Sequence, residues 1–318
     1  MTRPLVVQTE ELEPAPAAWL AERCELVVCP HTDEPRLHDL LPRAQGLIVR
    51  TYTQVNAALL DRAPALRVVG RAGVGLENID LADCRRRGVR VVHTPGANTR
   101  AVVEYVTALM LDALRPRVFL DAAPASAEWH TIRNLCTAPR QLSELTLGLW
   151  GFGRIGSAMA RVGAALDMRV LYDDLLEIPP AKRAGAVPVP AEELLAQSDI
   201  VSVHVDFRPA NRHLVNAAAF ARMKNDVVFV NTSRGFVVDP AALAAHFRAH
   251  PHASAWIDVH DPTEPIPAGY PMLGLPNVRV APHLASGTLT AKTNMSWVVR
   301  DIWRVLRGEE PENPAPGF

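Results

Sequence analysis

The chain has 318 residues, 48% of them hydrophobic, with 33 basic against 34 acidic side chains. This length suggests two domains of ordinary size, each able to bury its own core. A formal net charge of −1 gives no general attraction to nucleic acid or anionic lipid, so neither is expected as a partner.

The first ten residues contain no apolar stretch long enough for a signal peptide, and no run in the chain approaches the roughly 18 apolar residues of a membrane span. The four cysteines have no CxxC pairing, which favours reduced thiols over a metal site, and no metal is expected. These features predict a soluble cytoplasmic protein without a membrane partner.

In the first third of the chain, short β-branched runs alternate with amphipathic helical stretches. Strands are predicted at 5–7, 25–28, 46–49, 66–69 and 89–92. Helices are predicted between them, for example at 55–62 and 78–87. Nearly continuous apolar strands separated by helices indicate a parallel sheet covered on both faces.

A long helix is predicted over Thr99–Leu114, the natural place for the chain to cross between domains. A second series of strands follows at 145–150, 168–172, 199–205, 226–230, 255–259 and 278–281. Helices are clearest at 154–166, 191–197, 217–223 and 241–250. A closing helix at about 289–306 is expected to return and pack on the first domain. The pattern predicts an α/β fold with two doubly wound parallel sheets.

A glycine turn joins the first strand of the second series to a helix; its residues are Gly151, Phe152, Gly153, Arg154, Ile155 and Gly156. Gly151 permits a tight turn, Gly153 lets the backbone approach a pyrophosphate, and Gly156 lets the helix pack closely on the strand. The next strand ends in Asp173-Asp174, and Asp174 lies 18 residues beyond Gly156. A carboxylate at this distance holds ribose hydroxyls and favours NAD over NADP.

A second glycine cluster, Gly70-Arg71-Ala72-Gly73-Val74-Gly75, also follows a strand. Its spacing does not suit a dinucleotide turn, and it could be a plain turn. The better use of this segment is to offer backbone N–H groups to a small anion such as a substrate carboxylate.

Three polar side chains follow predicted strands of the second series: Arg234, Glu264 and His283. Singly, each could be a surface ion pair, a solvated acid or a loop histidine. Together they supply what hydride transfer needs, because a cation fixes a carboxylate, an imidazole exchanges the hydroxyl proton, and an acid holds the imidazole.

At these residues the sequence resembles the D-isomer-specific 2-hydroxyacid dehydrogenase family, and within it the D-3-phosphoglycerate dehydrogenase branch in a short form. The resemblance runs from about Gly46 to the last helix. Its motifs are Leu47-Ile-Val-Arg50, Val69-Gly-Arg71-Ala-Gly-Val-Gly75, Thr94-Pro-Gly-Ala-Asn98, the Gly151 turn, Val230-Asn-Thr-Ser-Arg234-Gly and Ala281-Pro-His283.

The resemblance implies a Rossmann-type NAD domain (98–285), a discontinuous flavodoxin-like substrate domain (1–97 and 286–318), and a homodimer. It implies that Arg234 binds the substrate carboxylate, with help from the amides of Ala72, Gly73 and Val74. His283 would exchange the hydroxyl proton and Glu264 would pair with it. Thr232 and Asp258 would join the turn residues and Asp174 in holding NAD.

One departure concerns the acid that pairs with the histidine. The family usually has it five residues after the strand-end Asp, whereas Glu264 is six residues after Asp258. Asp261 is therefore the alternative, although the following Pro265 matches and favours Glu264.

Two kinds of substrate remain possible from the sequence. One is 3-phosphoglycerate with its 2-keto acid, and the other is a short acid such as glyoxylate or hydroxypyruvate. Arg50 and Arg71 match positions that meet the substrate phosphate in the phosphoglycerate branch, while Arg133 lies near a third such arginine at a different spacing. The chain leaves no room after its closing helix for a serine-binding regulatory domain, so feedback by serine is not expected. A different class of function is an NAD-sensing binding module resembling the C-terminal binding proteins.

Overall fold

A computed structural model describes residues 3–318 and divides the chain into two compact units. Unit 1 comprises Met1–Arg100 and Ser286–Phe318, and unit 2 comprises Ala101–Ala285. From the sequence, the first crossing between domains is expected after residue 97, shortly before the long helix. In the described residues, no helix combines the length and apolar character needed to cross a membrane.

Unit 1 is built on a five-stranded parallel sheet with the order β2-β1-β3-β4-β5, the flavodoxin-like arrangement. The elements from the first part of the chain are β1 (Leu5–Gln8), α1 (Pro14–Ala21), β2 (Glu25–Val28), α2 (Glu34–Leu40), η1 (Leu41–Arg43), β3 (Gly46–Val49), α3 (Ala57–Asp61), β4 (Val68–Arg71), α4 (Leu81–Arg86) and β5 (Arg90–Val92). The last part of the chain adds α11 (Leu289–Ser296) and α12 (Val299–Leu306).

Successive side chains of these strands point to opposite faces of the sheet, and both faces are buried. Val6, Ile48 and Val68 pack in a core with residues of α1 and α12. Val7 and Leu47 belong to the opposite core, together with residues of α2, α3 and α4. The near-continuous apolar runs of the sequence follow from this double burial.

The closing segment forms two helices, where the sequence analysis expects one. The break follows Ser296, whose hydroxyl donates to the carbonyl of Lys292 one turn earlier and accepts the amide hydrogen of Glu13. A hydroxyl that bonds back to its own helix in this way commonly bends it. The second helix, α12, packs on β4, as expected for a segment returning to the first domain.

Unit 2 is built on a seven-stranded parallel sheet with the order β12-β11-β10-β9-β6-β7-β8. Its elements are α5 (Thr99–Leu114), α6 (Ser126–Leu135), η2 (Leu142–Glu144), β6 (Thr146–Trp150), α7 (Arg154–Ala165), β7 (Arg169–Asp173), η3 (Pro180–Lys182), β8 (Val187–Pro188), α8 (Ala191–Gln197), β9 (Ile200–Val203), η4 (Pro209–Asn211), α9 (Ala217–Phe220), β10 (Val228–Asn231), η5 (Gly235–Val237), α10 (Pro240–Ala249), β11 (Ser254–Ile257) and β12 (Val278–Val280).

The strands of unit 2 are also covered on both faces. Val201 and Phe229 pack in one core with residues of α8, α9 and α10. Ile200 and Val230 pack in the opposite core with residues of α5 and α7. The chain proceeds outward from β6 to β8 and then returns to place β9 on the other side of β6. The order therefore reverses between β6 and β9, which is the point where sheets of this kind bind ligands.

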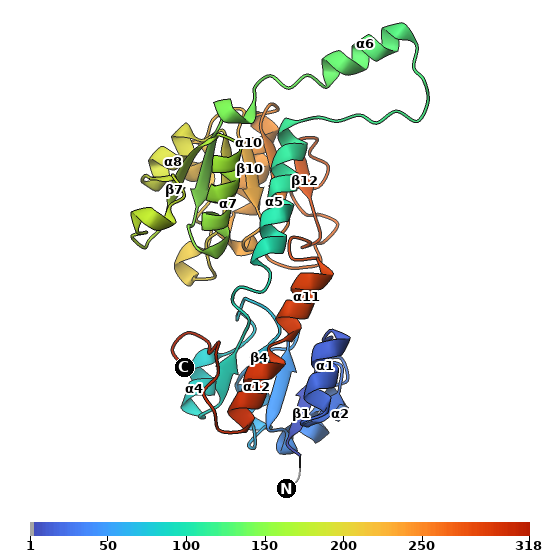
Figure 1. Cartoon of the computed structure of the whole chain (residues 1–318), viewed down its shortest axis with the longest axis vertical. Coiled ribbons are helices and arrows are strands. Elements are labelled where there is room, and N and C mark those ends of the chain that lie inside the picture. Colours follow the sequence, from blue (N-terminus) through green and yellow to red (C-terminus); the bar gives the residue numbers. More distant parts are fainter. Residues whose placement is uncertain (1–2) are drawn as a thin grey trace. The chain divides into compact units, whose positions relative to one another are not determined.

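Helix α6, which the sequence analysis does not predict, lies in an arm made of residues 115–140. Figure 1 shows the arm leading away from the sheet of unit 2 and returning to it. Helix α6 has no buried residue, in contrast to α5 and α7. The arm therefore contributes little to the core of its own chain.

Candidate active site

The predicted glycine turn lies at the carboxyl end of β6, beside the reversal of strand order. Gly151 has a φ of 100°, and a Cβ there would lie 2.7 Å from the carbonyl group of His204 at the end of β9. A Cβ on Gly156 would lie 2.1 Å from the carbonyl oxygen of Gly151. A Cβ on Gly153 would meet nothing within 4 Å. Two glycines thus allow close backbone packing, and the third leaves open space where α7 begins.

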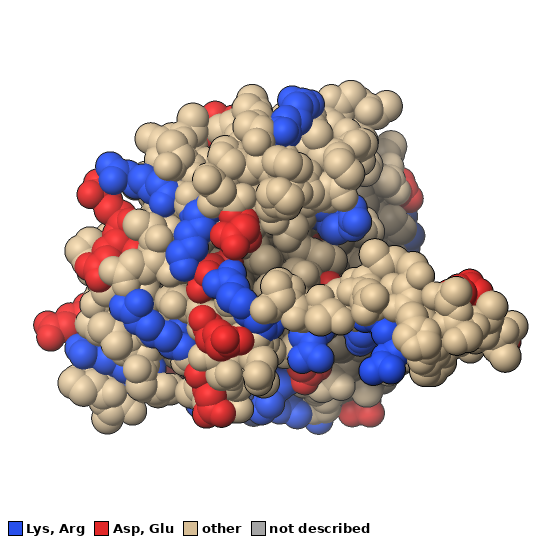
Figure 2. Space-filling model, turned by 90° about the horizontal axis from the view of Figure 1, so that it is seen from above, with Lys and Arg blue, Asp and Glu red and all other residues tan. Residues whose placement is uncertain are grey.

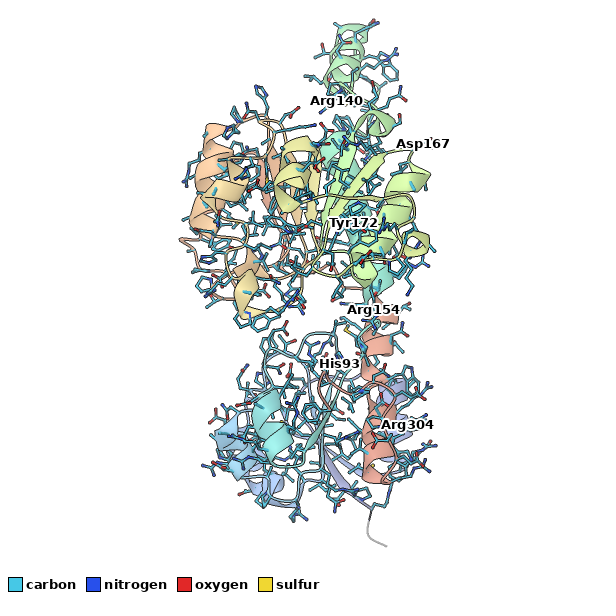
Figure 3. All side chains as sticks on the ribbon, turned by 90° about the vertical axis from the view of Figure 1, so that its left-hand side faces the viewer. His93, Arg140, Arg154, Asp167, Tyr172 and Arg304 are labelled. Atoms are coloured by element: carbon cyan, nitrogen blue, oxygen red, sulfur yellow. The ribbon has the colours of Figure 1, made fainter. Side chains whose placement is uncertain are left out.

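Asp174, the residue predicted to hold a ribose, lies against this turn. One carboxylate oxygen accepts the amide hydrogen of Phe152 at 2.6 Å, and the other accepts that of Leu176 at 2.8 Å. The ring of Phe152 is buried and lies 4.0 Å from the ring of Tyr172. Arg154 is exposed at the start of α7, whereas Tyr172 lies in the interior (Figure 3).

Two buried polar atoms at neighbouring strand ends have no hydrogen-bond partner among the described residues. They are Oγ1 of Thr232, directly after β10, and Nδ1 of His204, directly after β9. Nε2 of His204 lies 2.9 Å from Oγ of Ser202, and burial lowers the pKa of His204 to about 4. Because buried polar atoms are rarely left unpaired, these two indicate a place for polar groups of a ligand.

These residues fit a dinucleotide. The open space at Gly153 and the amides at the start of α7 suit a pyrophosphate, and Asp174 suits a ribose. The unpaired Thr232 hydroxyl suits a polar group of the same ligand.

Arg234 is placed by a buried asparagine at the end of β10. Oδ1 of Asn231 accepts from the amide and the hydroxyl of Ser233 at 3.0 and 2.7 Å, and Nδ2 of Asn231 donates to the carbonyl oxygen of Arg234 at 3.1 Å. The next residue, Gly235, lies so close to another loop that a Cβ there would be 1.9 Å from the carbonyl oxygen of His260. The segment that carries Arg234 is thus packed on the segment that carries Glu264.

Glu264 and His283 are in direct contact, with Oε2 of Glu264 2.7 Å from Nδ1 of His283. The hydrogen bond with Glu264 raises the pKa of His283, against the opposing effect of burial and of Arg234. Burial alone would raise the pKa of Glu264, but the hydrogen bond and charge of His283, with the amide of His260, hold it below its usual value. The pair therefore favours a charged carboxylate and a proton-accepting imidazole.

Asp258 shapes the loop that carries His283. Its carboxylate is fully buried and accepts the amide hydrogens of Leu284 and Ala285 at 2.7 and 2.8 Å. Burial nevertheless raises the pKa of Asp258. His283 itself has a φ of 55°, an uncommon value for a residue other than glycine. Asp258 and the β11 end therefore hold His283 in a backbone conformation that it would seldom adopt alone.

Asp261, the alternative partner for His283, has other neighbours. Its two carboxylate oxygens lie 3.5 Å from Nη1 of Arg212 and 3.6 Å from Nε2 of His213. The structure thus brings together Glu264 and His283, with Arg234 close enough to affect the pKa of His283. In the described residues there is no group of three or more His, Cys, Asp or Glu side chains that could hold a metal ion.

The predicted substrate-binding residues Arg50, Arg71, Ala72, Gly73 and Val74 lie in unit 1, at the carboxyl ends of the adjacent strands β3 and β4. The guanidinium of Arg71 lies over Gly73, where a Cβ would be 1.5 Å from Nη1. The amide of Ala72 donates to Val49 and that of Gly73 to Arg71. Of the three amides expected to bind a substrate carboxylate, two are thus bonded within the chain, which leaves the amide of Val74.

Asn231, Gly235, His204 and Glu10 are not among the site residues that the sequence predicts. His204 and Glu10 each stand just after a strand, and this position was a usable signal. The roles of Asn231 and Gly235 depend on contacts with other residues, for which the sequence has no local signal.

Residues 107–285 match the family model described as D-isomer specific 2-hydroxyacid dehydrogenase, NAD binding domain. The chain is 34% identical over 326 residues to a glyoxylate reductase of Thermofilum pendens, covering 98% of this chain and 94% of that protein. It is 35% identical over 311 residues to a D-3-phosphoglycerate dehydrogenase of Mycobacterium tuberculosis, covering 97% of this chain but 58% of that protein. For the Archaeoglobus fulgidus D-3-phosphoglycerate dehydrogenase, 35% identical over 270 residues, the shares are 84% and 50%.

Solved structures share this fold over nearly the whole chain. The TT0316 protein from Thermus thermophilus is 34% identical with a TM-score of 0.83, covering 98% of this chain and 99% of that chain. A D-lactate dehydrogenase from Aquifex aeolicus, complexed with NAD and lactic acid, is 26% identical with a TM-score of 0.79, covering 96% of each chain.

Proposed function

The chain belongs to the D-isomer specific 2-hydroxyacid dehydrogenase family of NAD-dependent oxidoreductases, and we propose that it interconverts a small D-2-hydroxy acid and its 2-keto acid. The observation that carries this proposal is the contact between Glu264 and His283 in the unit that holds the glycine turn. An imidazole with a raised pKa, paired with a carboxylate, is suited to exchange the proton of a hydroxyl group.

The proposed roles divide among three side chains. His283 takes the hydroxyl proton during oxidation and returns it during reduction, with Glu264 stabilising its charged form. Arg234 binds the substrate carboxylate and so orients carbon 2. Bound NAD supplies the nicotinamide carbon that exchanges the hydride. Thr232, Asp174 and the turn residues hold the cofactor. Asp258, which the resemblance also places in the NAD site, is assigned instead to the His283 loop, because its buried carboxylate bonds to the amides of that loop.

The substrate class is a small 2-hydroxy or 2-keto acid. Relatives of similar identity are named glyoxylate reductase and D-3-phosphoglycerate dehydrogenase. Glyoxylate, hydroxypyruvate and 3-phosphohydroxypyruvate are therefore the acids to compare.

The test is consumption of NADH by purified protein with these acids and pyruvate, using His283→Ala and the matched control His252→Ala. His252 is exposed in the same unit, outside the proposed site. We expect turnover with at least one acid, a loss of about 10²-fold or more in His283→Ala, and no loss in His252→Ala. Tight NADH binding without turnover of any acid would contradict the proposal and favour the NAD-sensing module.

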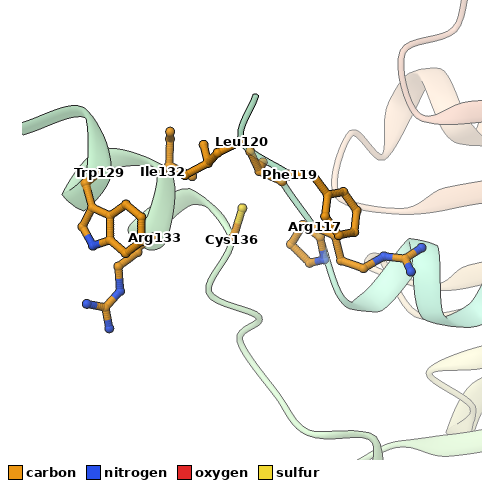
Figure 4. Close-up of a pocket in the computed structure, with 9 residues that line it drawn as sticks. Arg117, Phe119, Leu120, Trp129, Ile132, Arg133 and Cys136 are labelled. Carbon is orange, nitrogen blue, oxygen red and sulfur yellow. The ribbon is translucent and has the colours of Figure 1, made fainter. Parts of the chain in front are cut away.

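We also propose that a second copy of the chain covers the arm. Phe119 is 84% exposed and Leu135 is 75% exposed. With the arm residues Val118, Leu120, Trp129 and Ile132 and the half-buried Cys136, they form a largely apolar surface, and Figure 2 shows that much of the arm seen there carries neither acid nor base. Figure 4 shows the groove between helix α6 and the segment of residues 116–120, lined by Phe119, Leu120, Trp129, Ile132 and Cys136 and flanked by Arg117 and Arg133.

A helix of the length of α6 is marginal in water without packing. Because most oligomers are symmetric pairs of one chain, a second copy is the partner that this surface fits. Light scattering after size exclusion should give twice the chain mass, reduced to one chain mass in Phe119→Ser/Leu135→Ser. Leu176→Ser, exposed outside the arm, should leave the mass unchanged, and a wild-type monomer would refute self-association.

A further inference from the structure

The loop of residues 50–53, directly after β3, is closed around the carboxylate of Glu10. Oε1 of Glu10 accepts the amide hydrogens of Arg50, Tyr52 and Thr53 at 2.9, 3.0 and 3.1 Å. Oε2 accepts the amide hydrogen of Thr51 at 2.7 Å. Four consecutive N–H groups that could surround an anion are thus already bonded to one within the chain.

The fold explains why Glu10 reaches this loop. β1 and β3 are neighbours in the sheet, and Glu10 follows β1 just as the loop follows β3. Oγ1 of Thr9 lies 2.6 Å from Oγ1 of Thr53, and Nδ2 of Asn78 donates to the carbonyl oxygen of Thr53 at 2.7 Å. Thr9 and Asn78 therefore hold the loop in place, and the carboxylate of Glu10 is enclosed by it.

The carboxylate of Glu10 is charged at neutral pH. Burial alone would raise its pKa, but the four amide hydrogen bonds of the loop hold the pKa below its usual value. The group therefore places a fixed negative charge at the backbone of residues 50–53, where it opposes the approach of a second anion.

This loop lies next to the other predicted substrate-binding residues of unit 1. β3 and β4 are hydrogen-bonded neighbours, so Arg50 and Arg71 emerge at the same edge of the sheet. Carboxyl edges of parallel sheets are where ligands bind. If the segment after β4 meets the substrate carboxylate, the loop after β3 is placed for the far end of the molecule.

We propose that Glu10 is a specificity-determining residue that rejects substrates with a second anionic group, so that the enzyme acts on 2-hydroxy and 2-keto monoacids without a phosphate. This inference rests on the proposed function and chooses between its candidate substrates. A phosphate at the loop would find its amide donors occupied and a carboxylate already present. Discrimination by a fixed like charge is a common route to specificity.

The test compares hydroxypyruvate with 3-phosphohydroxypyruvate, which differ only in the phosphate. For the wild type we expect kcat/KM for the phosphorylated acid to be at least about tenfold lower. Glu10→Gln keeps the size of the side chain and removes its charge, and should raise the ratio of phosphorylated to unphosphorylated kcat/KM about tenfold. Glu11→Gln, an exposed neighbour, should leave the ratio unchanged.

The outcomes separate this inference from the proposed function. Wild-type preference for the phosphorylated acid would overturn the inference and leave the dehydrogenase proposal standing. An equal loss for both acids in Glu10→Gln would also overturn it, because a merely structural role lowers activity without changing the ratio. Absence of turnover with every 2-keto acid would overturn both. The wild-type ratio decides the matter even if Glu10→Gln does not fold.

Discussion

The carboxylate of Glu264 is held at both oxygens. Oε1 accepts the amide hydrogen of His260 at 2.9 Å, and Oε2 lies 2.7 Å from Nδ1 of His283. The backbone thus fixes the acid, and the acid fixes the imidazole. With Nδ1 engaged, Nε2 of His283 is the nitrogen available for proton exchange with a substrate.

Replacing Glu264 with Gln should change the pH dependence of the reaction. Reduction of a 2-keto acid requires protonated His283, so wild-type kcat/KM should fall as pH rises through the raised pKa of His283. Without the negative partner, that pKa falls and the decline should begin at lower pH, with turnover reduced about tenfold or more. The pH profile of kcat/KM measures the change. Asp261→Asn, in the same loop, should leave the profile in place, and an unmoved profile in Glu264→Gln would show that the pair does not control the proton.

Gly235 should tolerate no side chain. In Gly235→Ala the new Cβ would lie 1.9 Å from the carbonyl oxygen of His260, so the Arg234 and Glu264 segments must separate. We expect kcat/KM to fall about tenfold or more, because small displacements of positioning groups are costly. Gly269→Ala, where a Cβ meets nothing within 4 Å, should keep full activity. Equal activities of the two variants, measured in one assay, would disprove the coupling of the segments.

The unpaired hydroxyl of Thr232 should bind a ligand and should not contribute to the stability of the fold. Thr232→Val has nearly the same shape, so the melting temperature of the cofactor-free protein should stay the same or rise. The Kd for NADH, measured by fluorescence titration, should increase about three- to tenfold. Thr107→Val is the control, because its hydroxyl donates to the carbonyl oxygen of Val103 in its own helix. A lower melting temperature with unchanged NADH affinity would assign the hydroxyl to the fold instead.

The two acids at the end of β7, Asp173 and Asp174, should differ in their effect on cofactor choice. Asp174 contacts the glycine turn through Phe152, so its removal should relax discrimination against the 2′-phosphate of NADPH. We expect Asp174→Ser to raise kcat/KM with NADPH, relative to NADH, about tenfold. Asp173→Ser should change this ratio less. The reverse order, measured with both cofactors, would move the ribose-binding role to Asp173.

Much of the fold could be predicted because both sheets are buried on both faces. Their strands therefore appear as apolar runs, and α5 and α8 begin and end where the pattern predicts. β4 is found two residues later than expected, at Val68–Arg71, because Gly70 and Arg71 lack the apolar signal. Helix α6 is not predicted, because none of its residues is buried and it therefore lacks the apolar pattern of a core helix.

The candidate site could be predicted where a chemically distinctive residue follows a strand. Arg234 and His283 are of this kind. Gly235 is not, since its effect depends on the nearby carbonyl oxygen of His260. Glu10 does follow a strand, but the sequence does not show that its partner is the loop of residues 50–53. A single sequence carries no record of those pairings.

One face of the sheet of unit 1 is covered by a helix from the last part of the sequence. Val298 and Ile302 pack with Val6, Ile48 and Val68, and a Cβ on Gly70 would lie 2.3 Å from Cδ1 of Ile302. During synthesis, the first hundred residues leave the ribosome without the helix that covers one side of their sheet, while all of unit 2 is already available. Unit 2 should therefore fold first on the ribosome, and the first hundred residues should be the region that chaperones bind until residues 286–318 have been synthesised.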